Sequence, residues 1–359
     1  MNDDGTTASP PLRRWVLLTG FPTFAARYLL WHMAECEPNT HIACIVTEDE
    51  LGRAQALIDA HQLTSRIQLL TGDITALDLG LSGREYLDVV QNVTDIYHLA
   101  SAWTTTTDRR LLEQVNVVGT RHVLQCVRDA HQLNRYNHLS TAYVCGDTTG
   151  VIMEEELLPD ALRNPYEASQ YEAEVAVRRL MDLGLPISIY RPSTIVGHSA
   201  TGQIDHFTGP YLFFRPMVRL PANVPIPVPS RGSSPLNLVP IDYVIRALYH
   251  ISVHTNGAGR TYHLIDPNPL SAARVFELIA LTAGRPLPRT LPRPLSRMVL
   301  RLPFLDRALQ TGRSILTGFD RWTIFNAMNT AEMNREGGPI CPPFADYVDT
   351  LVEFIRTPR

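Results

Sequence analysis

The chain has 359 residues, of which 45% are hydrophobic and 19% are charged. This composition is typical of a globular protein that buries a full core and divides into a large and a small domain. The formal net charge of −4 excludes a general attraction to nucleic acid, and no apolar run reaches the roughly 18 residues of a membrane span. The polar start, MNDDGTTASPPL, lacks the apolar core of a signal peptide, so we expect a cytoplasmic protein.

Cysteine and lysine usage limit the available chemistry. Five scattered cysteines without C-x-x-C pairing predict neither a disulfide framework nor a zinc site, and we expect no metal centre. All 32 of the Lys+Arg residues are arginine. The chain therefore has no lysine ammonium group to use in catalysis.

Short apolar strands alternate with helical stretches in the first half of the chain. Strands are predicted at 15–20, 41–46, 66–74, 95–101, 136–144 and 187–197, and helices at 23–35 and from Tyr166 onward. Continuous apolar strands separated by helices are typical of a parallel sheet that helices cover on both faces. The pattern predicts an α/β fold with a doubly wound, Rossmann-type sheet.

The sequence becomes proline-rich and irregular after residue 200, which suggests a change of domain. We expect 1–13 to be a flexible N-terminus and 14–200 to form a dinucleotide-binding domain to which 236–266 returns. Residues 201–235 and 267–359 are predicted to form a smaller substrate domain or lid beyond the carboxyl ends of the strands.

Seven motifs carry a family resemblance. They are TGDITALDLGLS (71–82), DIYHLAS (95–101), NVVGTRHVL (116–124), HLSTAYVCG (138–146), NPYEASQYEAE (164–174), YRPSTIVG (190–197) and LVPIDYV (238–244). In this order they resemble the extended short-chain dehydrogenase/reductases, and within them the fatty acyl-CoA reductase and thioester reductase branch. The resemblance implies NAD(P)-dependent reduction of a small-molecule or carrier-bound acyl substrate.

The resemblance also implies a reactive centre made of a hydroxyl residue, a tyrosine and a lysine. Tyr166 would donate a proton to the carbonyl oxygen as hydride reaches the carbon. Thr141 would hydrogen-bond that oxygen, with Ser140 as the adjacent candidate. Asn116 would hold a helix and a site water in register.

Gln170 stands where the family has its lysine. The lysine normally binds the nicotinamide ribose and lowers the pKa of the tyrosine through its charge. An amide can bond a ribose hydroxyl but brings no charge. The charge that lowers the tyrosine pKa is therefore lost, unless an arginine such as Arg191 reaches the site.

The cofactor side departs from the family pattern at two places. Thr23 occupies the second glycine position of T-G-x-x-G-x-x-G, which weakens pyrophosphate binding without excluding it. Thr47, Glu48 and Asp49 replace an arginine that favours NADP, so NAD is preferred. By the resemblance, the cofactor-binding residues are Thr19, Gly20, Phe21, Pro22, Thr23, Phe24, Thr47, Asp73, Ile74, Ala100, Ser101, Tyr190 and Pro192.

Two functional hypotheses follow from these departures. The first is an NAD(P)-dependent oxidoreductase that acts on a carbonyl, with Trp103, Tyr143 and His206 as candidate substrate residues. The second is a reductase-like protein that has abandoned hydride transfer and serves as a cyclase, a lyase or a binding scaffold. A homodimer is left open, and neither nucleic acid nor a membrane is an expected partner.

Overall fold

The computed structural model describes residues 14–102, 108–158, 162–221, 228–229, 232–288, 290–291, 322–335 and 337–357. The predicted flexible N-terminus, residues 1–13, and the candidate Trp103 lie outside the described residues.

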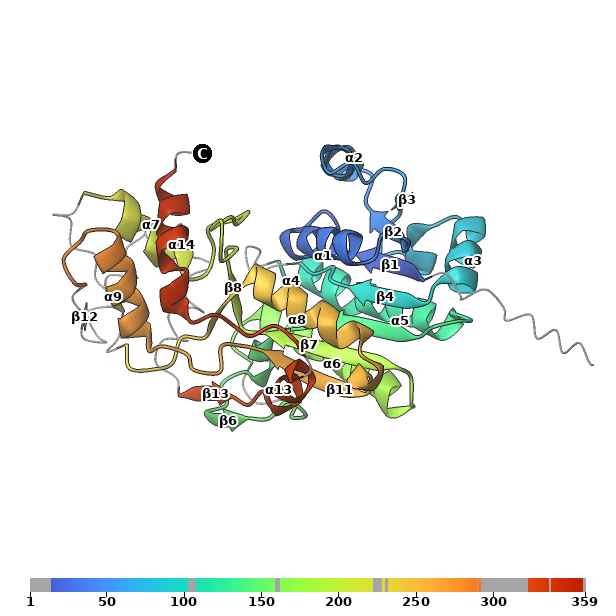
Figure 1. Ribbon diagram of the computed structural model, residues 1–359. Coiled ribbons are helices and arrows are strands. Elements are labelled where there is room, and N and C mark those ends of the chain that lie inside the picture. The colour runs from blue at the N-terminus through green and yellow to red at the C-terminus, as the bar shows by residue number, and fades with distance from the viewer. Residues whose placement is uncertain are drawn as a thin grey trace, which may run out of the picture.

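A seven-stranded parallel sheet in the order β11-β7-β5-β4-β1-β2-β3 forms the centre of the molecule (Figure 1). Its strands are β1 (Trp15–Thr19), β2 (His41–Val46), β3 (Ile67–Thr71), β4 (Asp95–His98), β5 (Arg135–Leu139), β7 (Ile187–Pro192) and β11 (Arg260–Leu264). The doubly wound sheet predicted from the sequence is thereby confirmed. The winding direction reverses between β1 and β4, so a binding crevice is expected at the carboxyl ends of these two strands.

Helices cover both faces of this sheet because its central strands are apolar on both sides. Val16 and Leu18 belong to one buried cluster and Leu17 belongs to another, as alternation along a strand requires. The first cluster includes side chains of α1 (Phe24–Cys36), α2 (Leu51–Ala60) and α8 (Ile241–Val253). The second includes side chains of α3 (Gly83–Asn92), α5 (Thr120–Asp129) and α6 (Pro165–Asp182).

The structure shortens several predicted strands. Those predicted at 66–74 and 95–101 end at Thr71 and His98. The strand predicted at 136–144 ends at Leu139, and a 3₁₀ helix (Ala142–Cys145) follows, with the Thr141 hydroxyl accepting from the Tyr143 amide. The strand predicted at 187–197 divides at Ser193, whose hydroxyl donates to Asn237. Its second part, β8 (Thr194–Val196), leaves the main sheet and pairs with β10 (Leu238–Pro240).

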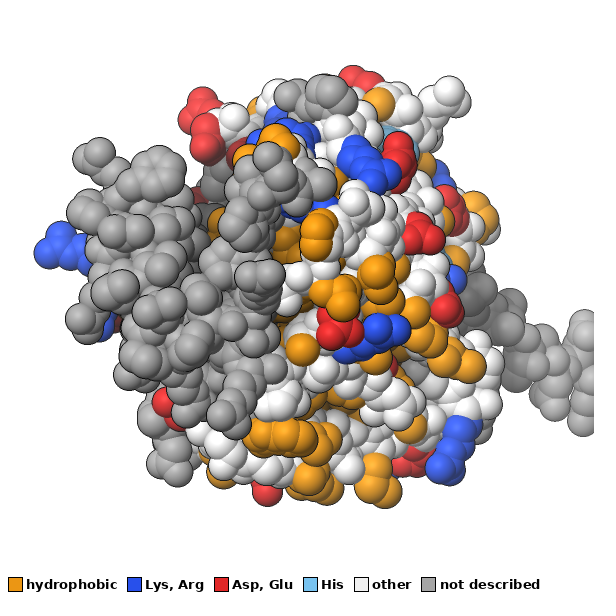
Figure 2. Space-filling model, turned by 90° about the vertical axis from the view of Figure 1, so that its left-hand side faces the viewer, with side chains coloured by type: hydrophobic (Ala, Val, Ile, Leu, Met, Phe, Trp, Pro, Cys, Tyr) orange, Lys and Arg blue, Asp and Glu red, His pale blue; other side chains and the backbone are white. Residues whose placement is uncertain are grey.

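Three further helices lie beyond the carboxyl ends of the strands (Figure 1). The helices α7 (Tyr211–Arg219), α9 (Ala272–Thr282) and α14 (Val348–Arg356) pack on one another at this end. Two further strand pairs are β6 (Gly150–Ile152) with β13 (Thr323–Phe325) and β9 (Val228–Pro229) with β12 (Thr290–Leu291). The remaining helical elements are α4 (Arg109–Leu112), a π-helical segment (Glu113–Gly119), α13 (Met328–Asn334), and short 3₁₀ helices at Leu77–Gly80, Thr255–Gly257 and Phe344–Asp346. Figure 2 looks onto this end and shows hydrophobic side chains exposed among a few acidic and basic ones.

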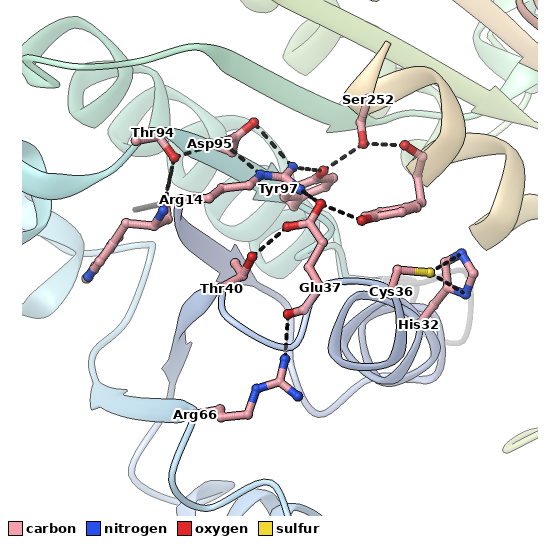
Figure 3. Close-up of polar contacts among 12 residues, drawn as sticks. Arg14, His32, Cys36, Glu37, Thr40, Arg66, Thr94, Asp95, Tyr97 and Ser252 are labelled. Atoms are coloured by element: carbon pink, nitrogen blue, oxygen red, sulfur yellow. Dashed lines mark hydrogen bonds and ion pairs between the residues drawn. The ribbon is translucent and has the colours of Figure 1, made fainter. Parts of the chain in front are cut away.

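A polar network joins the opposite end of the sheet to its covering helices (Figure 3). Arg14, just before β1, donates to Glu37 after α1, to Asp95 at 3.1 Å and to Tyr97 at 2.8 Å on β4. The Glu37 carboxylate also accepts from Thr40 and from Tyr249 of α8. Burial alone would raise the pKa of Glu37, but these donors together hold it below its usual value. The network therefore stabilises the fold only while Glu37 is ionised.

Replacing Glu37 should destabilise the fold because three donors converge on its charge. We expect Glu37→Gln to lower the free energy of unfolding by about 1–3 kcal/mol at pH 7, the range for hydrogen bonds to a charged group. Urea denaturation measures this, with Glu35→Gln as the control at an exposed position in the last turn of α1. Because the Glu37 pKa is depressed, the difference should disappear as the pH falls below its ordinary value of 4.5. Equal losses in both variants would contradict this role.

Candidate functional site

A cavity of about 320 Å³ lies at the carboxyl ends of the central strands, where the winding reverses. Elements far apart in the sequence contribute to it, including α1, α6, β8, α8 and β13. The sequence-predicted residues that line it are Thr23, Phe24, Ser101, Ser140, Thr141, Tyr143, Tyr166, Gln170 and Pro192. The structure therefore brings the candidate catalytic residues and the start of α1 to one place.

The turn between β1 and α1 offers a place for an anion. Gly20 has a φ of +91°, and a Cβ there would lie 2.6 Å from the Ala100 backbone nitrogen, so only glycine allows the turn to touch the end of β4. Thr23 precedes α1 in an extended conformation and makes no capping hydrogen bond with its side chain. The first amides of α1 therefore lack a capping side chain where the helix meets the cavity, an arrangement suited to a pyrophosphate.

A buried chain of hydrogen bonds links this turn to the helices beyond β4. The Thr19 hydroxyl lies 2.7 Å from His98 Nδ1, and His98 Nε2 lies 2.9 Å from the Thr120 hydroxyl. Thr120 uses its single proton to donate to the Asn116 carbonyl at 2.6 Å, so it accepts from His98. His98 Nε2 therefore carries a proton, and burial holds the His98 pKa well below its usual value so that the ring stays neutral. The Thr19 hydroxyl is consequently engaged in a hydrogen bond to His98 within the core.

Asn116 connects this chain to the candidate proton donor. Its Nδ2 donates to the Ser169 hydroxyl at 2.9 Å, and Ser169 donates to the Tyr166 carbonyl at 2.8 Å. Its Oδ1 accepts from the Ala102 amide at 2.7 Å and from the Ser101 hydroxyl at 3.2 Å. Asn116 itself is buried behind the cavity wall and holds the segment after β4 against α6.

Tyr166 lines the cavity and is buried. Burial raises its pKa to about 12, the Glu167 carboxylate contributes in the same direction, and the Ser101 hydroxyl opposes both. The Gln170 amide donates to the Ser101 hydroxyl at 2.6 Å. The phenol therefore stays protonated over the whole physiological pH range.

Ser140 and Thr141 have different surroundings although both line the cavity. The Ser140 hydroxyl donates to the buried Glu174 carboxylate at 2.7 Å. Thr141 accepts from the Tyr143 amide at 3.3 Å, which uses an oxygen lone pair and leaves its proton able to reach a substrate oxygen. Thr141 is thus better suited than Ser140 to bind the reacting carbonyl.

Arg191 does not replace the missing lysine, which corrects the alternative raised from the sequence. Its guanidinium lies 2.6 Å from Glu174 and also donates to the carbonyls of Glu154 and Glu156. Burial alone would raise the Glu174 pKa, but Arg191, Arg178 and the Ser140 hydroxyl lower it to about 2. This ion pair holds the floor of the site and leaves no charge for Tyr166.

Other sequence-predicted residues lie away from the cavity lining. Phe21, Pro22 and Ala100 form the turn and the strand end behind it, and the Tyr190 ring is buried in the core with its hydroxyl donating to Asn137. Three of them are exposed: Thr47 after β2, Asp73 after β3, and His206. Ile74 is buried. Among these, Thr47 and Asp73 occupy the sheet edge where the adenosine half of a dinucleotide would extend.

Arg163 lies in the cavity wall and was not predicted from the sequence. Arg163 pairs with Glu167 at 3.0 Å, and its guanidinium carbon lies 5.5 Å from the centre of the Tyr143 ring. The only sign of this arginine in the sequence is that its partner, Glu167, directly follows Tyr166. Burial raises the pKa of Glu167 and Arg163 opposes that rise. Asn237 and Phe325 also line the cavity, from segments that no motif connects to it.

Two absences apply to the described part of the chain. There, no three His, Cys, Asp or Glu side chains gather as metal ligands would. No helix in the same ranges has the length and apolar character needed to cross a bilayer.

Comparisons with known proteins agree with this architecture. A family model described as male sterility protein matches residues 18–248. The aldehyde reductase lnaA of Aspergillus flavus is 32% identical in an alignment of length 281 that covers 70% of this chain and 26% of that protein. The chain spans only about a quarter to a third of the length of three curated relatives.

Two solved structures share the fold. The terminal R domain from the myxalamid PKS-NRPS biosynthetic pathway has a TM-score of 0.81 at 24% identity, covering 97% of this chain and 91% of that one. A thiolation-reductase di-domain from an archaeal non-ribosomal peptide synthetase has a TM-score of 0.77 at 18% identity, covering 95% of this chain and 75% of the di-domain.

Buried histidines beside the site should make stability depend on pH. Burial lowers the pKa of His138 to about 4, so the ring is neutral when folded and takes up a proton more readily when unfolded. Its contribution to stability is complete above the unfolded pKa of 6.5 and is lost as the pH falls towards 4. Between pH 7 and pH 5, the free energy of unfolding of the wild type should fall by about 1–2 kcal/mol more than that of His138→Leu.

Urea denaturation at the two pH values measures this difference. A variant at an exposed histidine, His131→Gln, should follow the wild type at both. Parallel curves for wild type and His138→Leu would show that His138 is not held neutral in the folded state.

Proposed function

This chain belongs to the male sterility protein family, whose model describes an NAD-binding domain, and on that premise we propose that it reduces a carbonyl with NAD(P)H. The proposed substrate is an acyl thioester or the aldehyde derived from it. The observation that carries the proposal is the meeting of Tyr166, Thr141 and the start of α1 at one cavity. Family membership favours this reductase hypothesis over a cyclase, a lyase or a scaffold.

Tyr166 is suited to donating a proton rather than accepting one. With a pKa of about 12 the phenol is protonated at any working pH, as reduction of a carbonyl requires. Oxidation of an alcohol would need the phenolate, which is scarce near neutral pH. The absence of the lysine therefore costs the reductive direction less than the oxidative one. Thr141 would hold the carbonyl oxygen while Tyr166 delivers the proton.

The cradle at Gly20 and the open start of α1 fit the pyrophosphate of a dinucleotide. When bound, NAD(P)H supplies the hydride that reaches the carbonyl carbon. Gln170 would orient the nicotinamide ribose through its amide, and Asp73 would accept from the adenine. The exposed Glu48 and Asp49 after β2 would repel a 2′-phosphate, which favours NAD over NADP.

The cavity wall suits an acyl group. Apolar side chains contribute much of it, among them Leu99, Leu139, Ile195, Ile204 and Phe325. The names of similar proteins point to the same substrates, since one is an aldehyde reductase and another joins a reductase to a thiolation domain. We therefore propose that the acyl group arrives as a thioester on a carrier domain. Homodimer formation stays a prediction.

Removing the Tyr166 hydroxyl tests the proposed proton donor. We expect Tyr166→Phe to lower kcat for NADH-dependent reduction of a medium-chain acyl thioester by roughly 10²- to 10⁴-fold, the usual contribution of general acid catalysis. NADH binding should stay within about twofold, because the phenol is not part of the pyrophosphate cradle. Tyr171→Phe is the matched control, since Tyr171 lies on the same helix outside the cavity lining. Equal activity of the two variants would exclude Tyr166 as the donor.

Calorimetric titration with NAD, NADH, NADP and NADPH tests the cofactor. We expect NADH to bind at least about tenfold more tightly than NADPH, equivalent to about 1.4 kcal/mol of repulsion. Glu48→Gln combined with Asp49→Asn should narrow this gap, and Glu172→Gln, at an exposed position on α6, should leave it unchanged. Failure of all four nucleotides to bind up to millimolar concentrations would overturn the oxidoreductase proposal.

A further inference from the structure

We propose that Arg163 determines substrate specificity by hydrogen-bonding a second, uncharged oxygen acceptor of the acyl group, such as an amide carbonyl. Glu167 compensates the arginine charge, so a carboxylate in the same place is disfavoured. This inference rests on the proposed reductase function and adds to it the class of acyl group that the cavity selects.

Arg163 carries donors that a ligand in the cavity can reach. Its side chain is only 10% exposed and lines the cavity. Its Nε lies 3.0 Å from the Glu167 carboxylate, and its backbone amide donates to the same carboxylate at 3.0 Å. Within the described part of the chain, Nη1 and Nη2 make no hydrogen bond to the protein, and neither is sealed from solvent. The outer edge of the guanidinium is therefore open to a ligand.

The guanidinium is held in place along its inner edge and over an aromatic ring. Glu167 fixes the inner edge through Nε, and the guanidinium carbon lies 5.5 Å from the centre of the Tyr143 ring. That ring is itself held, because its hydroxyl lies 2.7 Å from the Thr194 hydroxyl and its edge meets Phe325 at 6.0 Å. The open edge of Arg163 is thus presented at a defined place, which lowers the entropy cost of binding a ligand there.

The position of Arg163 along the chain places it beside the proposed path of the acyl group. Tyr143 follows Thr141 by two residues, and Arg163 precedes Tyr166 by three. Tyr143 and Phe325 belong to the apolar part of the cavity wall. An acyl chain whose reacting carbonyl is held by Thr141 and Tyr166 would lie along this wall, next to Arg163.

The charges around Arg163 favour a neutral acceptor over an anion. Among the described residues that line the cavity, Arg163 is the one basic side chain and Glu167 is the one acidic side chain. A second carboxylate, that of Asp147, lies 3.8 Å from Arg163 Nε. The wall therefore has no net positive charge, and a substrate carboxylate would lose its hydration without gaining a compensating charge. An amide carbonyl loses less on entering and still accepts a strong hydrogen bond from a charged donor.

A plain alkyl group is disfavoured for a different reason. It would displace water from Nη1 and Nη2 without offering an acceptor, and a charged donor left unpaired in this way is costly. A site built to hydrogen-bond its substrate discriminates strongly against an analogue that lacks the bonding group. The cavity is thus expected to prefer an oxygen-bearing acyl group although much of its wall is apolar.

Three medium-chain thioesters of N-acetylcysteamine, equal in length, test the preference. The first has an alkyl chain, the second has an amide carbonyl at one of three successive positions in the chain, and the third ends in a carboxylate. We expect the best amide to exceed the alkyl thioester roughly tenfold in kcat/KM with NADH, the usual size of a hydrogen bond to a charged group. The carboxylate should be the poorest of the three.

Two variants assign this preference to the ion pair. Arg163→Met combined with Glu167→Gln removes both charges, so no buried carboxylate is left unpaired, and the amide-to-alkyl ratio should fall to within about twofold of one. Glu167→Gln alone leaves the arginine charge uncompensated, which should raise the carboxylate-to-alkyl ratio roughly tenfold. Ratios within one protein cancel any common effect of position 167 on Tyr166. Arg179→Met, at an exposed position on α6, is the matched control and should keep the wild-type ratios.

Binding provides a readout that needs no turnover. Thioether analogues, in which a methylene replaces the reacting carbonyl, should show the same order of affinities by calorimetric titration. Equal losses for all three thioesters in the double variant, or a wild type that prefers the alkyl or carboxylate ligand, would overturn the role of Arg163 and leave the reductase proposal standing. A wild type that binds the amide thioether most tightly but reduces no thioester with NADH would overturn the reductase proposal and leave Arg163 as the selecting residue.

Discussion

The close contact between the turn after β1 and the end of β4 is the constraint on which the site depends. Gly20 allows the two backbones to touch, and the bond from Thr19 to His98 fastens them from below. His98 is hydrogen-bonded to Thr120, and Thr120 to the Asn116 carbonyl. The Asn116 side chain in turn positions the segment containing Ser101. The cofactor turn and the proton donor are therefore parts of one hydrogen-bonded unit, and a shift at either end would disturb the other.

The members of this unit are neutral, which suits a buried position. A charged group at Gln170, where 4% of the surface is exposed, would need a compensating charge to offset its desolvation. An amide in the same place needs only acceptors, and the Ser101 oxygen is one at 2.6 Å. Burial raises the pKa of the Tyr166 phenol to about 12, and no cation at Gln170 opposes this, so the phenol can donate but rarely accepts a proton. The site is in this way biased towards reduction.

The sequence predicted the sheet well because its strands are uninterrupted apolar runs between helices. It also identified Thr141, Tyr166 and Gln170, which meet at the cavity, since the motifs place them at a strand end and on one helix. It failed at two strand ends: the local cap at Thr141 and the bond from Ser193 to the remote Asn237 end strands that the apolar pattern alone would continue. The commitment of Arg191 to Glu174 has no sequence signal, because an ion pair between a strand and a helix depends on the folded arrangement.

The absence of lysine makes the choice of Gln170 understandable in physical terms. In this chain the alternative cation is arginine, whose planar guanidinium carries five donors and stays charged under all conditions. Where the structure buries such a group, as at Arg191, it surrounds it with a carboxylate and several carbonyls. The hydrogen-bond partners described for Ser101 are the Asn116 side-chain oxygen, the Ala102 carbonyl and the Gln170 amide, which could not satisfy the five donors of a guanidinium and compensate its charge. A compact neutral donor, such as the Gln170 amide, is the side chain that this position can hold.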